Sequence, residues 1–144
     1  LAMETQISNL LQSLFETDGE KFYKTPTFYV MKLLSDHAEQ YLIDAKSDSD
    51  DDLLDTVATV SKEGDKFTVS VINKHLYESK KLAFKLPVGE WSVTKADIVT
   101  AGDVHDYNSF DAPERVKASS FEVADLESIE IPPHSVVRIC LSRR

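Results

Sequence analysis

IEIPPHSVVRICL, residues 129–141, joins two alternating apolar stretches through a pair of prolines and a histidine. Alternation of apolar and other side chains is typical of a β-strand with one buried face. Proline donates no hydrogen bond to a β-ladder, so the proline pair ends the first strand. In the second strand, Val137 and Ile139 share one face and Arg138 lies on the other. The stretch predicts a strand–turn–strand unit, in which His134 is a turn residue rather than a catalytic base.

The same period of two extends over the chain from Leu53 onward. Two alternating runs, 53–62 and 66–73, flank the turn sequence EGD, an arrangement typical of a β-hairpin. Further alternating runs, each bounded by turn residues, occupy 80–87, 91–101, 117–124, 127–131 and 135–142. About seven or eight strands at this spacing predict an antiparallel β-sandwich.

The first 45 residues have a helical period instead. Residues 3–16 carry apolar side chains at helical spacing, which predicts a helix that ends at Gly19 in a left-handed conformation. A second helix is predicted over residues 25–40, with Thr25 as its N-cap and Pro26 at its first position. Two short amphipathic helices do not form a domain alone, so we expect the chain to be a piece of a longer protein.

Composition limits the functions that this chain can have. The 144 residues include 42% apolar residues, which suits one domain with a hydrophobic core. The net charge of -9 argues against partners such as nucleic acid or an anionic membrane surface. No apolar run is long enough to span a membrane. Cys140 is the only cysteine, which excludes an intramolecular disulfide and a site with several thiolates.

The sequence also shows no pattern that predicts a metal site. Its four histidines are dispersed, without the spacing of paired metal ligands. The acidic run 46–52 lacks the glycine and the distal glutamate of a calcium-binding loop, so we interpret it as a solvated linker. Asp103, His105 and Asp106 lie close to Asn108 in an irregular segment, where such side chains commonly bond their own backbone. We therefore expect no metal and no cofactor.

Four segments resemble, in the same order, motifs of the family 51 α-L-arabinofuranosidases. They are NLLQSLFETDGEKFYKTPTFYVMKLLSDH (9–37), FTVSVIN (67–73), ADIVTAGDVHDYNSFDAPERV (96–116) and IEIPPHSVVRICL (129–141). The pieces YNSFDAPERV and PPHSVV are the most specific of them. The sequence departs from the family pattern at Tyr107 and Ser109, neither of which bears on the chemistry.

The resemblance implies a longer parent enzyme, in which a (β/α)8 barrel is followed by a jelly-roll-like β-sandwich. On that basis we expect a mainly β chain: a jelly-roll-like antiparallel β-sandwich preceded by two short helices left over from the end of the barrel. Residues 1–38 would be the barrel remnant, and residues 39–144 the C-terminal sandwich domain. The family's sandwich also takes a strand from the chain before the barrel, so we expect an open sheet edge here.

The resemblance also implies the parent's reaction, which is the hydrolysis of terminal non-reducing α-L-arabinofuranosyl residues with retention. Retention requires two carboxyl groups about 5–5.5 Å apart, and in this family both are glutamates, one within an Asn-Glu pair. No Asn-Glu dipeptide occurs in the chain. We therefore assign no catalytic residue and expect the fragment to be inactive. Tyr23 and Lys24, at the end of the last barrel strand, are the expected substrate-proximal residues.

The expected partners of the parent enzyme are arabinofuranosyl oligosaccharides. We also expect a homo-oligomer, because the helices (with apolar residues such as Leu10 and Phe28) and the open sheet edge favour self-association. By the same resemblance we expect a cytoplasmic protein. The alternative is a free-standing β-sandwich that acts as a carbohydrate-binding or interaction module. For sugar stacking the candidate aromatic residues are Trp91, Tyr77 and Tyr107.

Overall fold

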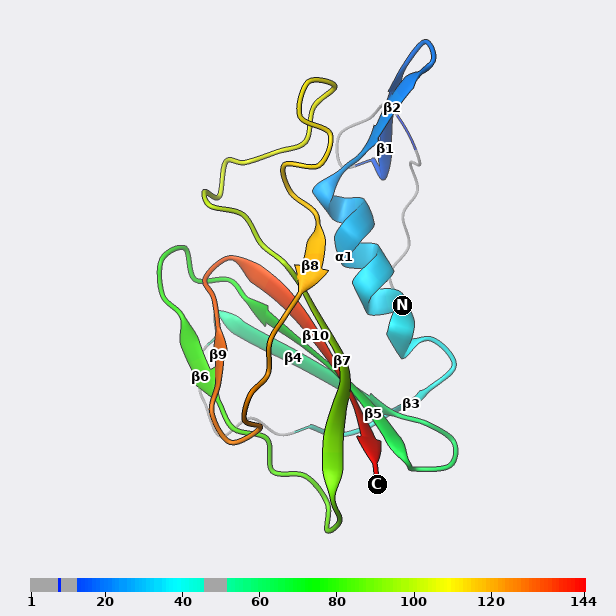
Figure 1. The fold of residues 1–144 in the computed structure, drawn as a ribbon, viewed down its shortest axis with the longest axis vertical. Helices are drawn as coiled ribbons and strands as arrows, with labels where there is room; N and C mark the ends of the chain where they lie inside the picture. Colours follow the sequence, from blue (N-terminus) through cyan, green and yellow to red (C-terminus); the bar gives the residue numbers. More distant parts are fainter. Residues whose placement is uncertain (1–7, 9–12, 46–51) are drawn as a thin grey trace.

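A six-stranded antiparallel sheet with the strand order β3-β4-β5-β10-β7-β8 is the main layer of the molecule (Figure 1). The computed structural model describes residues 8, 13–45 and 52–144. In sheet order, the strands are Tyr41–Leu42 (β3), Leu54–Val60 (β4), Lys66–Asn73 (β5), Ser135–Arg143 (β10), Trp91–Val99 (β7) and Ala118–Ser120 (β8). Two smaller sheets are formed by β6 (Lys80–Leu82) with β9 (Ile129–Ile131) and by β1 (Phe15–Asp18) with β2 (Lys21–Lys24). The predicted mainly β, antiparallel sandwich is therefore confirmed.

The strand β10 occupies the middle of the sheet, between β5 and β7. The turn before it holds His134 at a φ of 37°, and the backbone N–H of His134 donates to the carbonyl oxygen of His75 over 2.8 Å. The two ring nitrogens lie 2.9 Å and 3.0 Å from the carbonyl oxygens of Leu76 and Ala101. These contacts confirm that His134 has a structural role in the turn.

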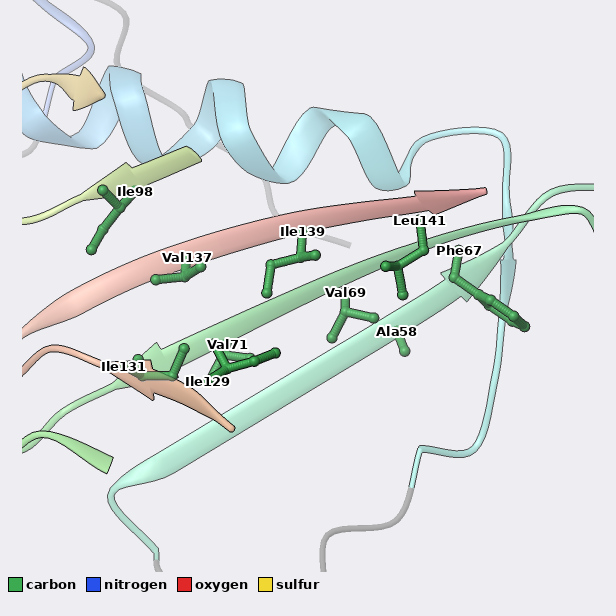
Figure 2. Close-up of a cluster of buried hydrophobic side chains, with 10 residues drawn as sticks. All are labelled: Ala58, Phe67, Val69, Val71, Ile98, Ile129, Ile131, Val137, Ile139 and Leu141. Atoms are coloured by element: carbon green, nitrogen blue, oxygen red, sulfur yellow. The ribbon is translucent and has the colours of Figure 1, made fainter. Parts of the chain in front are cut away.

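One face of the large sheet forms the main hydrophobic core. Val71, Val137 and Ile139 are completely buried there, and Ile131 of β9 covers them from the second layer. Figure 2 shows that the core side chains gather on the side of the sheet away from the helix α1. Burial of each such side chain contributes about 1.5–3 kcal/mol, so this face supplies much of the stability.

The other face of the sheet is covered by the helix α1 (Pro26–Leu34) and the short 3-10 helix η1 (Ser35–His37). Thr25 is the N-cap of α1, since its hydroxyl accepts a hydrogen bond from the Phe28 N–H, and proline follows it at the first helical position. Leu33 is the buried contact of α1, in a small cluster with Val99 and Val116. Both capping predictions are confirmed, although α1 ends at Leu34 and not at residue 40.

The predicted first helix is wrong in the part that the structure describes. Most of residues 3–16 lie outside the described residues, but Phe15 and Glu16 belong to the strand β1. That strand forms a hairpin with β2, in which Gly19 (φ 59°) and Glu20 form the turn. Turn chemistry and strand pairing therefore outweigh the apolar period of 3.6 at this position. Among the described residues α1 is the only α-helix.

The position of the core predicts that a valine-to-alanine substitution changes the free energy of unfolding by different amounts at a buried and at an exposed site. Val137→Ala removes two buried methyl groups from the middle of the sheet and should lower the free energy of unfolding by about 2 kcal/mol. Val88→Ala, at a side chain that is 95% exposed, should change it by less than about 0.5 kcal/mol. Urea denaturation of both variants measures the difference. Equal effects would contradict the assignment of the core.

Candidate functional site

The hairpin β1–β2 lies beside the long loop 102–116, which connects β7 to β8 (Figure 1). Asn108 joins the two segments and is 2% exposed. Its side-chain amide donates to the carbonyl oxygens of Lys24 and Val116, both over 2.8 Å, and accepts from the Val116 N–H over 2.7 Å. An amide with three satisfied bonds fixes both backbones. The loop therefore holds the end of β2 in place.

Tyr23 and Lys24, the residues expected near the substrate, are neighbours on β2 and contact different elements. The ring of Tyr23 meets the ring of Phe110 edge-on, with 5.0 Å between the centroids. The Lys24 ammonium lies 5.1 Å from the centre of the Phe28 ring on α1. Burial raises the pKa of the Tyr23 phenol, as do nearby Glu16 and Tyr107 to a smaller degree. The two side chains share one end of the molecule but do not converge.

The segment Asp103–Asp106 makes turn contacts of the predicted kind. The Asp103 carboxylate accepts hydrogen bonds from the backbone N–H and the ring of His105, both over 2.8 Å. These bonds, the backbone one first, lower the pKa of Asp103. Asp106 accepts from the Asp103 N–H and pairs with Arg115. The carboxylates therefore shape the loop around Asn108.

A cluster of buried and half-buried polar side chains lies between the sheet and the α1–η1 segment, and we call it the helix-side cluster. Its members are Asp36, His37, Gln40, Thr59, Thr68, Ser70, Asp97, Arg138 and Cys140. Arg138 projects from the middle of β10 and is 1% exposed. Its guanidinium pairs with Asp97 of β7 and, over 2.6 Å, with Asp36 of η1. It also donates to the Cys140 sulfur over 3.1 Å.

The ring of His37 is the second link between η1 and the sheet. Its two nitrogens lie 2.8 Å from the hydroxyl oxygens of Thr59 on β4 and Ser70 on β5. Burial lowers the pKa of His37 below its ordinary value of 6.5, the Arg138 charge adds to this, and the Asp36 carboxylate opposes it. A neutral ring can accept from one hydroxyl and donate to the other.

Gln40 completes the same row of contacts. Its amide accepts from the Thr59 hydroxyl over 2.8 Å and donates to Thr68 over 3.2 Å. Residues 36–40 therefore provide polar partners for side chains on three strands, β4, β5 and β10. This cluster was not predicted from the sequence, although an arginine between Val137 and Ile139 in an apolar strand is a signal that could have indicated it.

The helix-side cluster has the properties of a structural junction. Both carboxylates that face Arg138 are held by its guanidinium, so neither is positioned to attack a substrate. Among the described residues, no three histidine, cysteine, aspartate or glutamate side chains form a group that could hold a metal ion. No helix in the described ranges has the length and apolar character that crossing a bilayer requires.

These features define an antiparallel β-sandwich domain whose polar groups hold a hairpin and a helix against its sheets. Residues 2–135 match the family described as the α-L-arabinofuranosidase C-terminal domain, and the chain belongs to that family. It is 29% identical over 153 residues to an intracellular exo-α-L-arabinofuranosidase of Bacteroides ovatus, an alignment that covers 96% of this chain and 29% of that protein. The chain thus spans less than a third of this relative.

Solved structures show the same fold. The GH51 arabinofuranosidase of Xanthomonas axonopodis pv. citri superimposes with a TM-score of 0.78 at 22% identity, over 96% of this chain and 30% of that one. For the α-L-arabinofuranosidase of Thermotoga maritima the TM-score is 0.77 at 21% identity, over 94% of this chain and 32% of that one. In both cases the chain corresponds to a minor part of a longer protein.

The lowered pKa of His37 predicts a loss of stability in mild acid. As the pH falls through about 6.5, the ring binds a proton in the unfolded chain but stays neutral in the folded one. The free energy of unfolding should therefore fall from pH 6.5 down to the lower folded-state pKa, and no part of this contribution is lost above pH 6.5.

Denaturation at about pH 7.5 and about pH 5.5 measures this effect. His37→Gln should shrink the difference between the two conditions. The same loss in acid for His37→Gln and the unaltered chain would show that His37 is not the group responsible.

Proposed function

We propose that this chain is the C-terminal, non-catalytic part of an α-L-arabinofuranosidase. The parent enzyme would hydrolyse terminal non-reducing α-L-arabinofuranosyl residues of arabinofuranosyl oligosaccharides in the cytoplasm. The observation that carries this proposal is the family match over residues 2–135, in a chain that covers only 29% of its curated relative. The absence of an Asn-Glu dipeptide from the sequence supports placing the catalytic glutamates elsewhere in the parent.

The proposed division of the chain assigns residues 1–38 to the end of the barrel and residues 39–144 to the sandwich. The contacts of the described residues support a firm junction between the two parts. Asn108 holds the backbone of Lys24, and Arg138 pairs with Asp36. We propose that this junction sets the position of the sandwich against the barrel, which is the structural role of the domain in the parent.

Tyr23 and Lys24 remain the residues that we propose to lie near the substrate. Both belong to β2, the second strand of a short hairpin at the end of the molecule that carries the loop 102–116. Active sites of (β/α)8 barrels lie at the C-terminal ends of the strands. The anchoring of the Lys24 carbonyl by Asn108 would keep this strand end in one position.

Activity measurements test the assignment. The isolated chain should not release nitrophenol from p-nitrophenyl α-L-arabinofuranoside, whereas the parent enzyme should. In the parent, Lys24→Ala should lower kcat/KM about tenfold, which corresponds to the loss of one charged contact. Lys21→Ala, on the same strand and exposed, is the matched control and should have little effect. Turnover by the isolated chain, or an inactive parent, would contradict the proposal.

We propose self-association through the outer edge of β4. In the described part of the chain, β3 pairs with Thr59 and Val60 of this edge and the Ile43 N–H donates to Ala58 over 3.1 Å, whereas residues 54–57 have no strand partner on that side. Leu42, which is 75% exposed, lies beside it. An uncovered strand edge favours pairing with another chain.

Light scattering after size-exclusion chromatography tests this association. The chain should have a mass above that of one copy, and Leu42→Lys should shift it toward the monomer because a charge blocks edge pairing. Leu76→Lys changes another exposed leucine, 51% exposed, and should leave the mass unchanged. A monomer at every concentration would contradict the proposal.

A further inference from the structure

A groove of about 530 Å³ lies between the start of β7 and the loop 123–127. The residues that line it include an aromatic residue, Trp91, and the polar residues Ser92, Asp125, Glu127 and Arg144. Sites for small ligands have volumes of about 300–1,000 Å³, with apolar and aromatic walls and a few polar groups. The groove has this size and this mixture of groups.

The ring of Trp91 is held in a fixed orientation. Its indole N–H donates to the carbonyl oxygen of Pro87 over 3.0 Å, and the ring of Phe67 lies behind it with 4.6 Å between the centroids. The turn that leads to Trp91 contains Gly89 at a φ of 144°, where a Cβ atom would come within 2.8 Å of the Arg143 guanidinium. A rigid aromatic wall binds a ligand at a low cost in conformational entropy.

The opposite wall of the groove is also fixed by the backbone. Asp125 accepts from the Glu127 N–H over 2.8 Å, and the Leu126 carbonyl accepts from the Phe84 N–H over the same distance. The backbone N–H of Arg144 donates to Glu90 over 2.9 Å. Among the described residues, the Glu127 carboxylate and the Arg144 guanidinium have no protein partner, and both residues line the groove, so an acceptor and a donor group are available to a ligand there.

We propose that this groove, which we call the Trp91 groove, binds a neutral oligosaccharide. The C–H face of a sugar ring packs on an indole ring, and sugar hydroxyls both donate and accept hydrogen bonds. They therefore complement a carboxylate acceptor and a guanidinium donor in the same site. An anionic ligand is disfavoured by Asp125, Glu127 and the net charge of -9. The inference that the oligosaccharide is an arabinan rests on the proposed function, whereas the inference that the groove binds an oligosaccharide does not.

The chain contains one tryptophan, so its fluorescence reports directly on the groove. Titration of the 144-residue chain with linear arabinohexaose should produce a saturable change in emission. Glu127→Gln combined with Arg144→Gln should raise Kd about tenfold or more, because each removes a charged hydrogen-bonding group. Both side chains are exposed, which keeps Trp91 and its packing in place. Tyr77→Ala, at an 85% exposed ring outside the groove, is the control and should leave Kd unchanged.

A titration with xylohexaose, compared with that of arabinohexaose, shows which sugar the groove prefers. Binding of either hexasaccharide that weakens in the double variant supports the groove, and preference for arabinohexaose supports the choice of arabinan. No saturable change with either sugar, or equal Kd values for the double variant and the unaltered chain, would overturn the proposal.

Assays of the parent enzyme distinguish a failure of this proposal from a failure of the proposed function. In the parent enzyme, the double variant should raise KM for polymeric arabinan and leave kcat/KM for p-nitrophenyl α-L-arabinofuranoside unchanged. A parent that hydrolyses neither substrate refutes the proposed function, while fluorescence still decides the groove. Equal loss on both substrates would contradict a site that contacts only the polymer.

Discussion

The buried guanidinium of Arg138 is the constraint on which the arrangement of the two faces depends. It projects from the central strand β10 and is 1% exposed. A buried charge without a partner costs several kcal/mol, so carboxylates must accompany it. Asp97 comes from the neighbouring strand, but Asp36 comes from η1 and reaches the guanidinium only when the helical segment lies on this face. One charge therefore links the position of α1 and η1 to the sheet.

Because apolar and polar side chains alternate along β10, the two faces of the sheet bind their covering layers through different interactions. Val137 and Ile139 contact an apolar layer that includes β9, where burial is non-directional. Arg138 contacts a layer through directional bonds, which His37 and Ser70 extend across the strands. The polar face therefore fixes orientation and the apolar face supplies stability. Asn108 bonds the carbonyl oxygen of Lys24, just before α1 begins. Together with Asn108, the polar face therefore positions the hairpin β1–β2 in relation to the sandwich.

Several parts of this fold could be predicted from the sequence because their signals are local. The alternation in 129–141 predicted β9, β10 and the structural role of His134, and Thr25 with Pro26 predicted the start of α1. The hairpin β1–β2 was missed because residues 3–16 have an apolar helical period, whereas the strand is fixed by its pairing with β2. The helix-side cluster was missed because its partners are distant in sequence, and period alone does not show which segment covers a face.

Hydrogen exchange of Asp36→Asn tests most directly whether the Arg138 pairing holds the helical segment to the sheet. This substitution removes one carboxylate from the guanidinium at a side chain that is 41% exposed. The amides of residues 27–37 should then exchange faster, whereas those of β5 and β10 should keep their protection, because their ladder and apolar core are unchanged. Unaltered protection of residues 27–37 would contradict the account, and so would a uniform loss across β5, β10 and α1.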